Sequence, residues 1–414
     1  MTDLTAANFF RDPPVQDDPY PYFDAVRALG PVWQEPHHGV YLVTGHDEAL
    51  AVYNDAAHFS SCNVVSGPFV PFPEPFEGDD VTDVIARHRE MLPFSDQLPS
   101  FDPPRHSEHR ALMMRLLTPG RLRENEEFMA GLSGRLLEQL IATGRCDVVD
   151  DYAKPFALLV VAELEGVPEE DHPKFAEGFG GVRKELAHKP LEFLYEQFSA
   201  YVEDRRREPR DDILTKMATA TFPDGTVPEV NDVALLAANL FTGGQETTVS
   251  LLSFALRILA ERQDLQDRLR GDRDLIPNFV EETLRYESPL RAQFRMAKVR
   301  TTVGGLDIPA GSTMLLLPGA ANRDPRKFTD AGTFDLERDN AIYHLAFGHG
   351  IHHCAGAHLA RAEGKVTINR LLDLTKGFSI SEAAHGPVDD RRWEYLPTYF
   401  LRGLQRLDLE LTPA

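Results

Sequence analysis

The sequence predicts a mainly helical protein with a smaller β region, and two patterns carry this prediction. Helical periodicity dominates from residue 106 onward and recurs in the segments 111–117, 129–141, 191–203, 231–269 and 274–286. Strand-like material is short and lies in the segments 40–44, 302–308, 313–317 and 404–411. Gly304 and Gly305 predict a hairpin turn inside one of these segments.

Length and composition indicate a folded, water-soluble protein. Apolar residues make up 42% of the 414 residues and charged residues 26%, as in ordinary globular chains. No internal repeat, low-complexity tract or linker interrupts the sequence, so we expect a single domain over residues 1–414. We also expect a monomer.

The charge balance excludes several classes of partner. The chain has 43 Lys and Arg against 65 Asp and Glu, a formal net charge of −22. A field of that sign repels phosphate backbones and anionic lipid headgroups, so we expect neither nucleic acid nor a membrane as partner. No apolar stretch approaches the roughly 18–20 residues of a spanning helix. The first residues also lack the basic and then apolar order of a signal peptide.

The cysteines point to a reducing compartment. Cys62, Cys146 and Cys354 are far apart and odd in number, which implies no disulfide framework. We therefore expect a cytoplasmic protein.

A proline-rich segment between residues 67 and 104 cannot be a regular helix or a central strand throughout. Six phenylalanines lie in it or just upstream: Phe59, Phe69, Phe72, Phe76, Phe94 and Phe101. Long irregular loops of this kind are either functional covers or disordered. The phenylalanines favour a packed cover, and a loose surface insertion is the alternative.

The segment 231–262 predicts a central helix about 30 residues and about 45 Å long. Its apolar residues surround the helix axis, which is typical of a helix buried in a core. The middle, from Thr242 to Thr248, breaks this pattern with polar residues and with Gly243 and Gly244. Glycine lets another group approach the backbone, and a mid-helix threonine can open a local kink. A polar turn that faces an interior water is the alternative.

The strongest signal is a loop from Phe347 to Gly356 that holds one cysteine, Cys354, before a predicted helix. Backbone N–H groups and the positive end of that helix can stabilise a thiolate there, and a thiolate is a metal ligand. Zinc is one option because several histidines lie nearby: His344, His349, His352, His353 and His358.

The spacing in this loop argues against zinc, because structural zinc takes ligand pairs from two distant segments. A single axial thiolate on haem iron needs one cysteine, glycines against which a flat macrocycle can lie, and an apolar neighbour such as Phe347. The placement of Phe347, Gly350 and Gly356 around Cys354 therefore favours haem.

The loop matches the pattern Phe-Gly-x-Gly-x-His-x-Cys-x-Gly at every fixed position and so resembles the haem-binding signature of the cytochrome P450 superfamily. The resemblance extends from about residue 101 to residue 411 and is closest to the soluble bacterial members. It implies a triangular helical prism with haem b between the long central helix and the cysteine loop, and Cys354 as the iron ligand.

Further motifs that resemble those of the family occur along this chain in the order that the family shows. The stretch from Gly243 to Thr248 resembles the oxygen-activating turn of the central helix, and Glu282-x-x-Arg285 resembles a buried pair that Arg338 would complete. Removing one member of a buried ion pair typically costs about 3–5 kcal/mol. The resemblance implies these cofactor-binding residues: His106, Arg110, Gly243, Arg295, Phe347, His352, Cys354 and Gly356.

The resemblance implies a monooxygenase that uses O2 and inserts one oxygen atom into a C–H bond of the substrate. Thr247 and Glu246 are the expected catalytic residues: the Thr247 hydroxyl supports the bound oxygen through a water, and Glu246 helps to bring protons. The family commonly has Asp where this sequence has Glu246. Electrons are expected from a separate ferredoxin or flavodoxin with its reductase.

Acidic redox partners would need a local basic patch on this acidic chain, with Arg110, Arg115 and Arg361 as candidates. Pairing of these arginines within the molecule is the alternative.

The phenylalanines of the proline-rich segment predict an apolar substrate of terpenoid, steroid, fatty-acid or aromatic type. By position, the expected pocket residues are Asn239, Thr242, Gly243, Leu290 and the turn 399–401. Asn239 is a candidate polar anchor, or an amide satisfied within the protein. A peroxide-driven peroxygenase or isomerase and a non-catalytic haem-thiolate sensor are the alternative functions; the first usually lacks the pair that Glu246 and Thr247 form.

Overall fold

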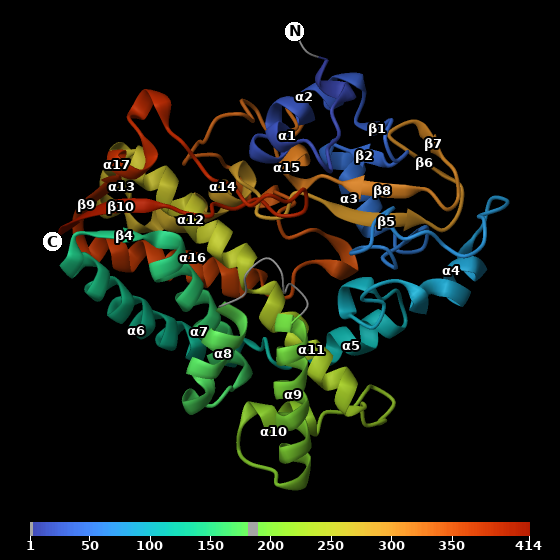
Figure 1. Ribbon diagram of the computed structural model, residues 1–414, viewed down its shortest axis with the longest axis horizontal. Coiled ribbons are helices and arrows are strands. Elements are labelled where there is room, and N and C mark those ends of the chain that lie inside the picture. Colours follow the sequence, from blue (N-terminus) through green and yellow to red (C-terminus); the bar gives the residue numbers. More distant parts are fainter. Residues whose placement is uncertain (1–2, 181–188) are drawn as a thin grey trace. The chain divides into compact units, whose positions relative to one another are not determined.

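The computed structural model describes residues 3–180 and 189–414, and helices make up most of it (Figure 1). The chain forms two compact units. Unit 1 comprises Met1–Ser107, Glu281–Cys354 and Tyr395–Arg402, and unit 2 comprises Glu108–Val280, Ala355–Glu394 and Gly403–Ala414. Helices α5 (Arg105–Met113) and α14 (Ile276–Tyr286) each contain a boundary between the units. The single domain over residues 1–414 stays a prediction.

Unit 1 is built on a five-stranded sheet with the strand order β1-β2-β8-β5-β3. Its strands are β1 (Val32–Gln34), β2 (Tyr41–Val43), β3 (Phe59–Ser60), β5 (Gln293–Ala297) and β8 (Thr313–Leu316), and a separate hairpin pairs β6 (Thr301–Val303) with β7 (Leu306–Ile308). Its helices are α1 (Pro13–Asp17), α2 (Tyr20–Leu29), α3 (His46–Asn54), α4 (Thr82–His88) and α15 (Pro318–Ala321). Strands β2 and β8 run parallel, and the other pairs of this sheet are antiparallel.

Both faces of this sheet are buried along β2 and along Met314–Leu316 of β8, which explains why these two segments are continuous apolar runs rather than alternating ones. Leu42 and Leu315 face one core, which also contains aromatic residues of the N-terminal segment such as Phe23. Val43 and Leu316 face a second core. The alternation places successive strand residues on opposite faces.

Unit 2 is mainly helical, with a three-stranded sheet in the order β4-β10-β9. Its strands are β4 (Arg145–Asp147), β9 (Thr375–Ile380) and β10 (Asp408–Pro413). Its helices are α6 (Pro119–Thr143), α7 (Lys154–Glu165), α8 (His172–Gly180), α9 (Lys189–Arg207), α10 (Ile213–Ala218), α11 (Val230–Gly243), α12 (Glu246–Glu261), α13 (Gln263–Gly271), α16 (Ala357–Leu374) and α17 (Glu382–His385).

Two glutamines of α13 bind the outer edge of β9. The amide groups of Gln263 and Gln266 donate to the Phe378 carbonyl oxygen at 2.7 Å and 2.8 Å. The Phe378 N–H in turn donates to Oε1 of Gln266 at 3.3 Å. Side chains thus satisfy main-chain groups that a neighbouring strand would otherwise pair.

The central helix is interrupted, which corrects the expectation of one helix over residues 231–269. It ends at Gly243, and α12 begins at Glu246 after Gln245, whose ψ of −86° departs from the helical value. Gly244 is required at the break because a Cβ there would lie 2.8 Å from Cγ2 of Val161. Arg262, with φ −125° and ψ 83°, then separates α12 from α13.

Two other predicted elements have different ends. The helix expected over 111–117 is the C-terminal part of α5 and stops at Met113. The last strand lies at 408–413 rather than 404–411, where it pairs with both β4 and β9. The hairpin is confirmed, with Gly304 at φ +57° and Gly305 at φ +82° between its strands.

The proline-rich segment is packed, as expected of a cover. Phe72 and Phe76 have ring centroids 4.9 Å apart and pack on a buried cluster around Cys62. Phe101 is buried beneath the Arg105 guanidinium, 4.0 Å from the ring centroid. Phe69 is 44% exposed but packs edge to face on Phe10. The loose insertion is therefore disfavoured.

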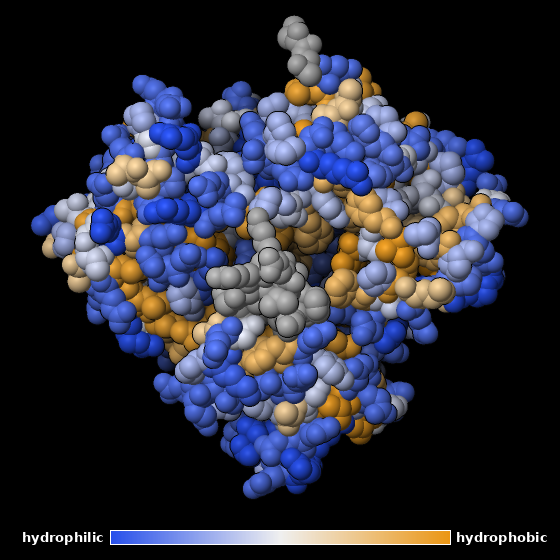
Figure 2. Space-filling view, viewed as in Figure 1, coloured by the Kyte–Doolittle hydropathy of each residue, from blue (hydrophilic) through white to orange (hydrophobic). Residues whose placement is uncertain are grey.

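Among residues 3–180 and 189–414, none of the helices has the length and apolarity needed to cross a bilayer. Hydrophilic residues cover most of the face shown in Figure 2, including the surface over α9 and α10.

Candidate functional site

The cysteine loop of unit 1 is a tight structure that fixes the position of Cys354. The Cys354 N–H donates to the Phe347 carbonyl oxygen at 2.9 Å, which closes the loop. Gly348 and Gly350 have φ values of +63° and +68°, which favour glycine. A Cβ at Gly350 would overlap the Tyr53 carbonyl oxygen of α3, so only glycine lets the loop approach this helix.

Cys354 is the one exposed cysteine of the three. It lies three positions before α16, whose N-cap is Gly356, so the positive end of a helix is close to the thiol. Cys62 and Cys146 are buried instead, and desolvation raises the pKa of their thiols to about 11 and about 12. Burial therefore disfavours the thiolate form of Cys62 and Cys146, whereas the side chain of Cys354 is open to a ligand.

Two histidines and one buried arginine of unit 1 are candidate haem-binding residues. The rings of His106 and His352 are 4.1 Å apart between centroids, and Nε2 of His352 lies 3.0 Å from the Ser61 hydroxyl. Arg295 on β5 is 5% exposed and donates from Nη1 to the Phe294 carbonyl oxygen at 2.7 Å. Burial lowers the pKa of Arg295. Tyr53 and Asp102 oppose this shift, and a further carboxylate beside the buried guanidinium would stabilise its charge.

The predicted triad of Glu282, Arg285 and Arg338 is confirmed. Arg285 donates from Nε and Nη2 to the two oxygens of Glu282 at 2.6 Å and 2.7 Å. Arg338 donates from Nε to Oε1 of Glu282 at 3.1 Å. Arg285 also binds carbonyl oxygens of the segment that precedes the cysteine loop: Asn322, Ala331 and Thr333. The triad thus holds α14 to this segment.

The predicted catalytic pair, Glu246 and Thr247, lies in unit 2 at the start of α12, directly after the break in the central helix. The Thr247 hydroxyl donates to the Gly243 carbonyl oxygen at 2.7 Å, one of the carbonyls that the break leaves without its helical partner. Glu246 is accessible to solvent, yet protein surrounds much of its carboxyl group. Desolvation raises the pKa of Glu246, and the nearby Lys154 opposes this shift.

Glu363 on α16 is a buried acid that the sequence reasoning missed. It is 1% exposed, and Oε2 accepts a hydrogen bond from the Thr248 hydroxyl at 3.1 Å. Burial raises its pKa to about 8, against the opposing effect of the Thr248 bond. The available signal was a glutamate inside the apolar stripe of a helix, between Ala362 and Gly364.

The remaining predicted residues lie on elements of unit 2. Arg110 is half-buried on α5, and Nε2 of its neighbour His109 lies 3.6 Å from Oδ1 of Asp232 on α11. A side chain at Gly243 would meet no atom within 4 Å, so a large group can approach the helix there. Gly356 caps α16 directly after the cysteine loop.

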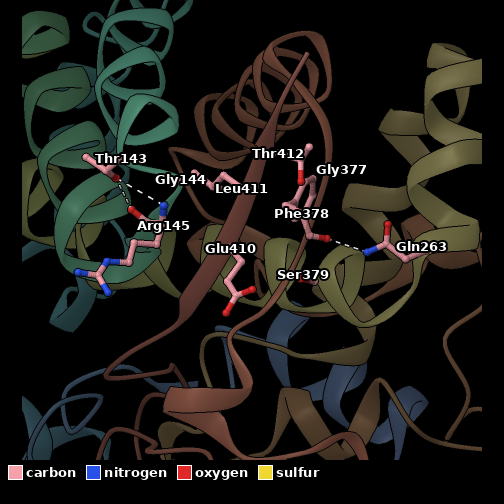
Figure 3. Close-up of a pocket in the computed structure, with 10 residues that line it drawn as sticks. All are labelled: Thr143, Gly144, Arg145, Gln263, Gly377, Phe378, Ser379, Glu410, Leu411 and Thr412. Atoms are coloured by element: carbon pink, nitrogen blue, oxygen red, sulfur yellow. Dashed lines mark hydrogen bonds between the residues drawn. The ribbon is translucent and has the colours of Figure 1, made fainter.

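A cavity of about 640 Å³ in unit 2 contains none of these predicted residues (Figure 3). Figure 3 shows β10 crossing it, with Thr143, Gly144 and Arg145 on one side and the Gln263–Phe378 hydrogen bond on the other. In the described part of the chain, no group of three or more His, Cys, Asp and Glu side chains could hold a metal ion.

Comparisons with known proteins show the family to which the chain is similar. A family model described as Cytochrome P450 matches residues 171–381. Cytochrome P450 144 of Mycobacterium tuberculosis is 33% identical over 430 residues, which cover 99% of this chain and 92% of the relative. The structure of Mycobacterium marinum cytochrome P450 CYP150A6 in the substrate-free form has a TM-score of 0.95 at 51% identity, covering 99% of this chain and 100% of that one.

A more distant structure is a complex with a second protein. It is P450BioI in complex with hexadec-9Z-enoic acid ligated Acyl Carrier Protein, with a TM-score of 0.79 at 28% identity, and it covers 96% of this chain and 99% of that one.

An exposed cysteine in a glycine-braced loop and a buried arginine are features that a haem-thiolate protein requires. The chain belongs to the cytochrome P450 family, and it is a monooxygenase with haem b as its cofactor. The fold expectation of a mainly helical P450 architecture with a smaller β region is thereby confirmed.

The residues present fit haem b. Within unit 1, the thiol of Cys354 is accessible, and Arg295 is a buried cation that a propionate would neutralise.

Proposed function

We propose that this monooxygenase hydroxylates an apolar small organic molecule with O2 and electrons from a separate ferredoxin or flavodoxin and its reductase. The substrate class is terpenoid, steroid, fatty-acid or aromatic. The observation that carries the proposal is the helix break in which Glu246 and Thr247 are adjacent to the opened Gly243 carbonyl. We also propose that the protein is cytoplasmic and monomeric.

The predicted site residues take three roles in this proposal: iron ligation, binding of the propionates and shaping of the haem surface. Sγ of Cys354 ligates the iron, and the positive end of α16 favours its thiolate. His106, Arg110, Arg295 and His352 bind the two propionates. Phe347, Gly243 and Gly356 shape the surfaces against which the macrocycle lies. When bound, haem supplies the binding and activation of O2.

The catalytic pair moves protons. A carboxyl group whose pKa is raised is protonated in a larger fraction of molecules near neutral pH, so Glu246 can release a proton from its carboxyl oxygen. Thr247 can then pass a proton through Oγ1 by exchanging its hydrogen bond to the Gly243 carbonyl for one to a water. Their adjacency on the first turn of α12 makes this transfer local.

The substrate class is supported by apolar residues and by relatives. Phe69 and Tyr399 lie 6.1 Å apart between ring centroids, beside the β-bridge that joins Leu290 to Leu401. Asn239 donates from Nδ2 to the Leu235 carbonyl oxygen at 2.6 Å, which supports the alternative that this amide is satisfied within its helix. The P450BioI structure contains a fatty acid, which supports the fatty-acid class among those named.

The first test is the spectrum of the reduced protein with carbon monoxide, followed by turnover of a set of lipophilic compounds. The expected result is a thiolate-type band and product formation with a ferredoxin and reductase. Turnover with hydrogen peroxide alone would favour the peroxygenase, and no turnover with any donor would favour the sensor.

Thr247→Ala tests the proton role. Without the hydroxyl, NAD(P)H oxidation should continue while less of it yields product and more yields hydrogen peroxide. Thr248→Val, one position along the helix, is the matched control. Fully coupled product formation in the Thr247→Ala variant would contradict the role.

A further inference from the structure

Arg291 is a buried guanidinium without a partner in unit 1. Its side chain is 1% exposed, and none of the described residues forms a hydrogen bond with Nε, Nη1 or Nη2. Only its main chain is bound: the Arg291 N–H donates to the Phe400 carbonyl oxygen at 2.9 Å. Buried polar groups are normally paired, so three orphaned nitrogens on one side chain require an explanation.

Glu287 is the carboxylate whose charge acts on this guanidinium, and it already accepts hydrogen bonds from other groups. Glu287 accepts hydrogen bonds at Oε2 from Nε of Arg402 at 2.7 Å and from the Tyr20 hydroxyl at 2.9 Å. Arg402 is itself 4% exposed and binds the Asp17 carbonyl oxygen through Nη1 at 2.8 Å. Arg323 adds a third guanidinium, 3.3 Å above the Tyr20 ring.

The group therefore has more positive than negative charge: Arg291, Arg323 and Arg402 against Glu287. Desolvation and the neighbouring Arg402 lower the pKa of Arg291 to about 10, so its guanidinium is still charged at neutral pH. A buried charge without a partner is strongly unfavourable, and one more anion would satisfy this group.

We propose that Arg291 binds a carboxylate. The guanidinium offers a planar fork of N–H donors that matches a carboxylate in a bidentate pair. The inference rests on the proposed function and narrows it, because Arg291 lies next to the Leu290–Leu401 bridge, in segments expected to line the substrate pocket. The favoured source is thus the carboxylate of a fatty-acid-like substrate, and a small free carboxylate is the other source.

The first experiment compares dodecanoic acid with dodecan-1-ol, which differs in the charged head group. Both are titrated into the haem-bound protein, and binding is followed by the shift of the haem absorption band. We expect the acid to bind at least about tenfold more tightly than the alcohol, since a charge-assisted pair is stronger than a neutral one. In Arg291→Met this preference should vanish, and in Arg291→Lys part of it should remain.

The second experiment measures thermal unfolding without a lipid ligand. If Arg291 is unpaired in the free protein, Arg291→Met should raise the melting temperature, because an apolar side chain of similar volume removes a buried charge. Arg402→Met is the matched control and should lower it, since Glu287 loses its partner. Added formate should stabilise the wild type and leave Arg291→Met unchanged.

The outcomes separate the two sources and the two proposals. An acid preference that depends on Arg291 supports a substrate carboxylate, and stabilisation by formate without an acid preference supports a small free carboxylate. A lower melting temperature for Arg291→Met, or the absence of both ligand effects, overturns the site. The proposed function fails separately, through loss of the carbon monoxide band or of turnover in the wild type.

Discussion

Glu363 shows how one buried side chain can make the stability of the whole protein depend on pH. Its carboxyl group faces the Thr248 hydroxyl inside unit 2, and burial raises its pKa from 4.5 to about 8. The folded protein therefore keeps a proton that the unfolded chain releases above its own pKa.

We predict that the free energy of unfolding falls as the pH rises from about 4.5 to about 8 because of this group, by up to about 1.4 kcal/mol per pH unit. Glu363→Gln keeps the shape and cannot ionise, so it should flatten the profile in this range. Denaturant titrations of the haem-bound protein at several pH values measure the slope. Glu138→Gln, at an exposed position, is the control, and equal slopes in wild type and Glu363→Gln would refute the assignment.

The contacts of Glu282 were predictable from the sequence because a spacing pattern marks this residue, and the role of Cys354 as the iron ligand stays a prediction. Glu363 was not predicted because its meaning depends on Thr248, which lies 115 positions away in the chain. The burial of Arg291 was not predicted for a similar reason. Arginines are mostly exposed, so its burial becomes evident only from the fold.

At the scale of elements, the cysteine loop depends on its contact with α3. Gly350 combines a φ of +68° with a main chain that approaches Tyr53 so closely that a Cβ would overlap its carbonyl oxygen. The loop can keep its shape only while this position has no side chain.

Gly350→Ala should therefore displace the loop and reduce haem retention. Gly305→Ala is a matched control, because Gly305 has a φ of +82° but no atom within 4 Å of the added Cβ. The control should show backbone strain of about 1–2 kcal/mol and normal haem content. Haem content and the carbon monoxide spectrum measure the difference, and full retention in Gly350→Ala would show that the loop tolerates the displacement.

The triad that holds α14 gives a second prediction at this scale. Glu282→Gln leaves the guanidinium groups of Arg285 and Arg338 buried without their shared carboxylate, and should cost about 3–5 kcal/mol of folding free energy. Asp307→Asn breaks the exposed pair with Arg300 and should change stability little. Chemical denaturation compares the two variants, and equal effects would show that burial of the triad is energetically unimportant.

The central helix shows what sequence patterns predict about elements. Gly243 and Gly244 indicated a disturbed turn, but the length of the break depends on Val161 of α7, which crowds Gly244. The register of the last strand also depends on its two partners, β4 and β9. Local periodicity contains no information about such distant neighbours.

At the scale of the whole molecule, the net charge of −22 should govern reduction by an acidic protein donor. Such a donor can approach only where cations locally outweigh this field, and Arg110, Arg115 and Arg361 are the candidates. Arg115 donates to the Thr221 carbonyl oxygen at 3.2 Å, so part of its hydrogen-bonding capacity is used within unit 2.

We predict that raising the ionic strength from about 20 mM to about 300 mM slows reduction by a ferredoxin, since salt screens exposed charges. Arg361→Gln should weaken this dependence, with Arg145→Gln, exposed on β4, as the control. Stopped-flow absorbance measures the rate. A rate that does not change with salt would remove the basic patch from consideration.

The fold class followed from the family pattern, whereas the order of strands did not. Strand β8 pairs with β2 in parallel although more than two hundred residues separate them, and both are only three or four residues long. Such short strands bury both faces, so their partners are set by the surrounding core rather than by alternation along the chain.

The glutamines that occupy the edge of β9 also bear on how these molecules behave when they are crowded. An open strand is a template on which a second chain can grow, and this is a common start of aggregation. Gln263 and Gln266 remove that template at Phe378 without a further strand. Concentrated preparations should therefore resist edge-to-edge association at this strand. Replacing either glutamine with an apolar residue would expose unpaired main-chain groups of β9 on which another chain could pair.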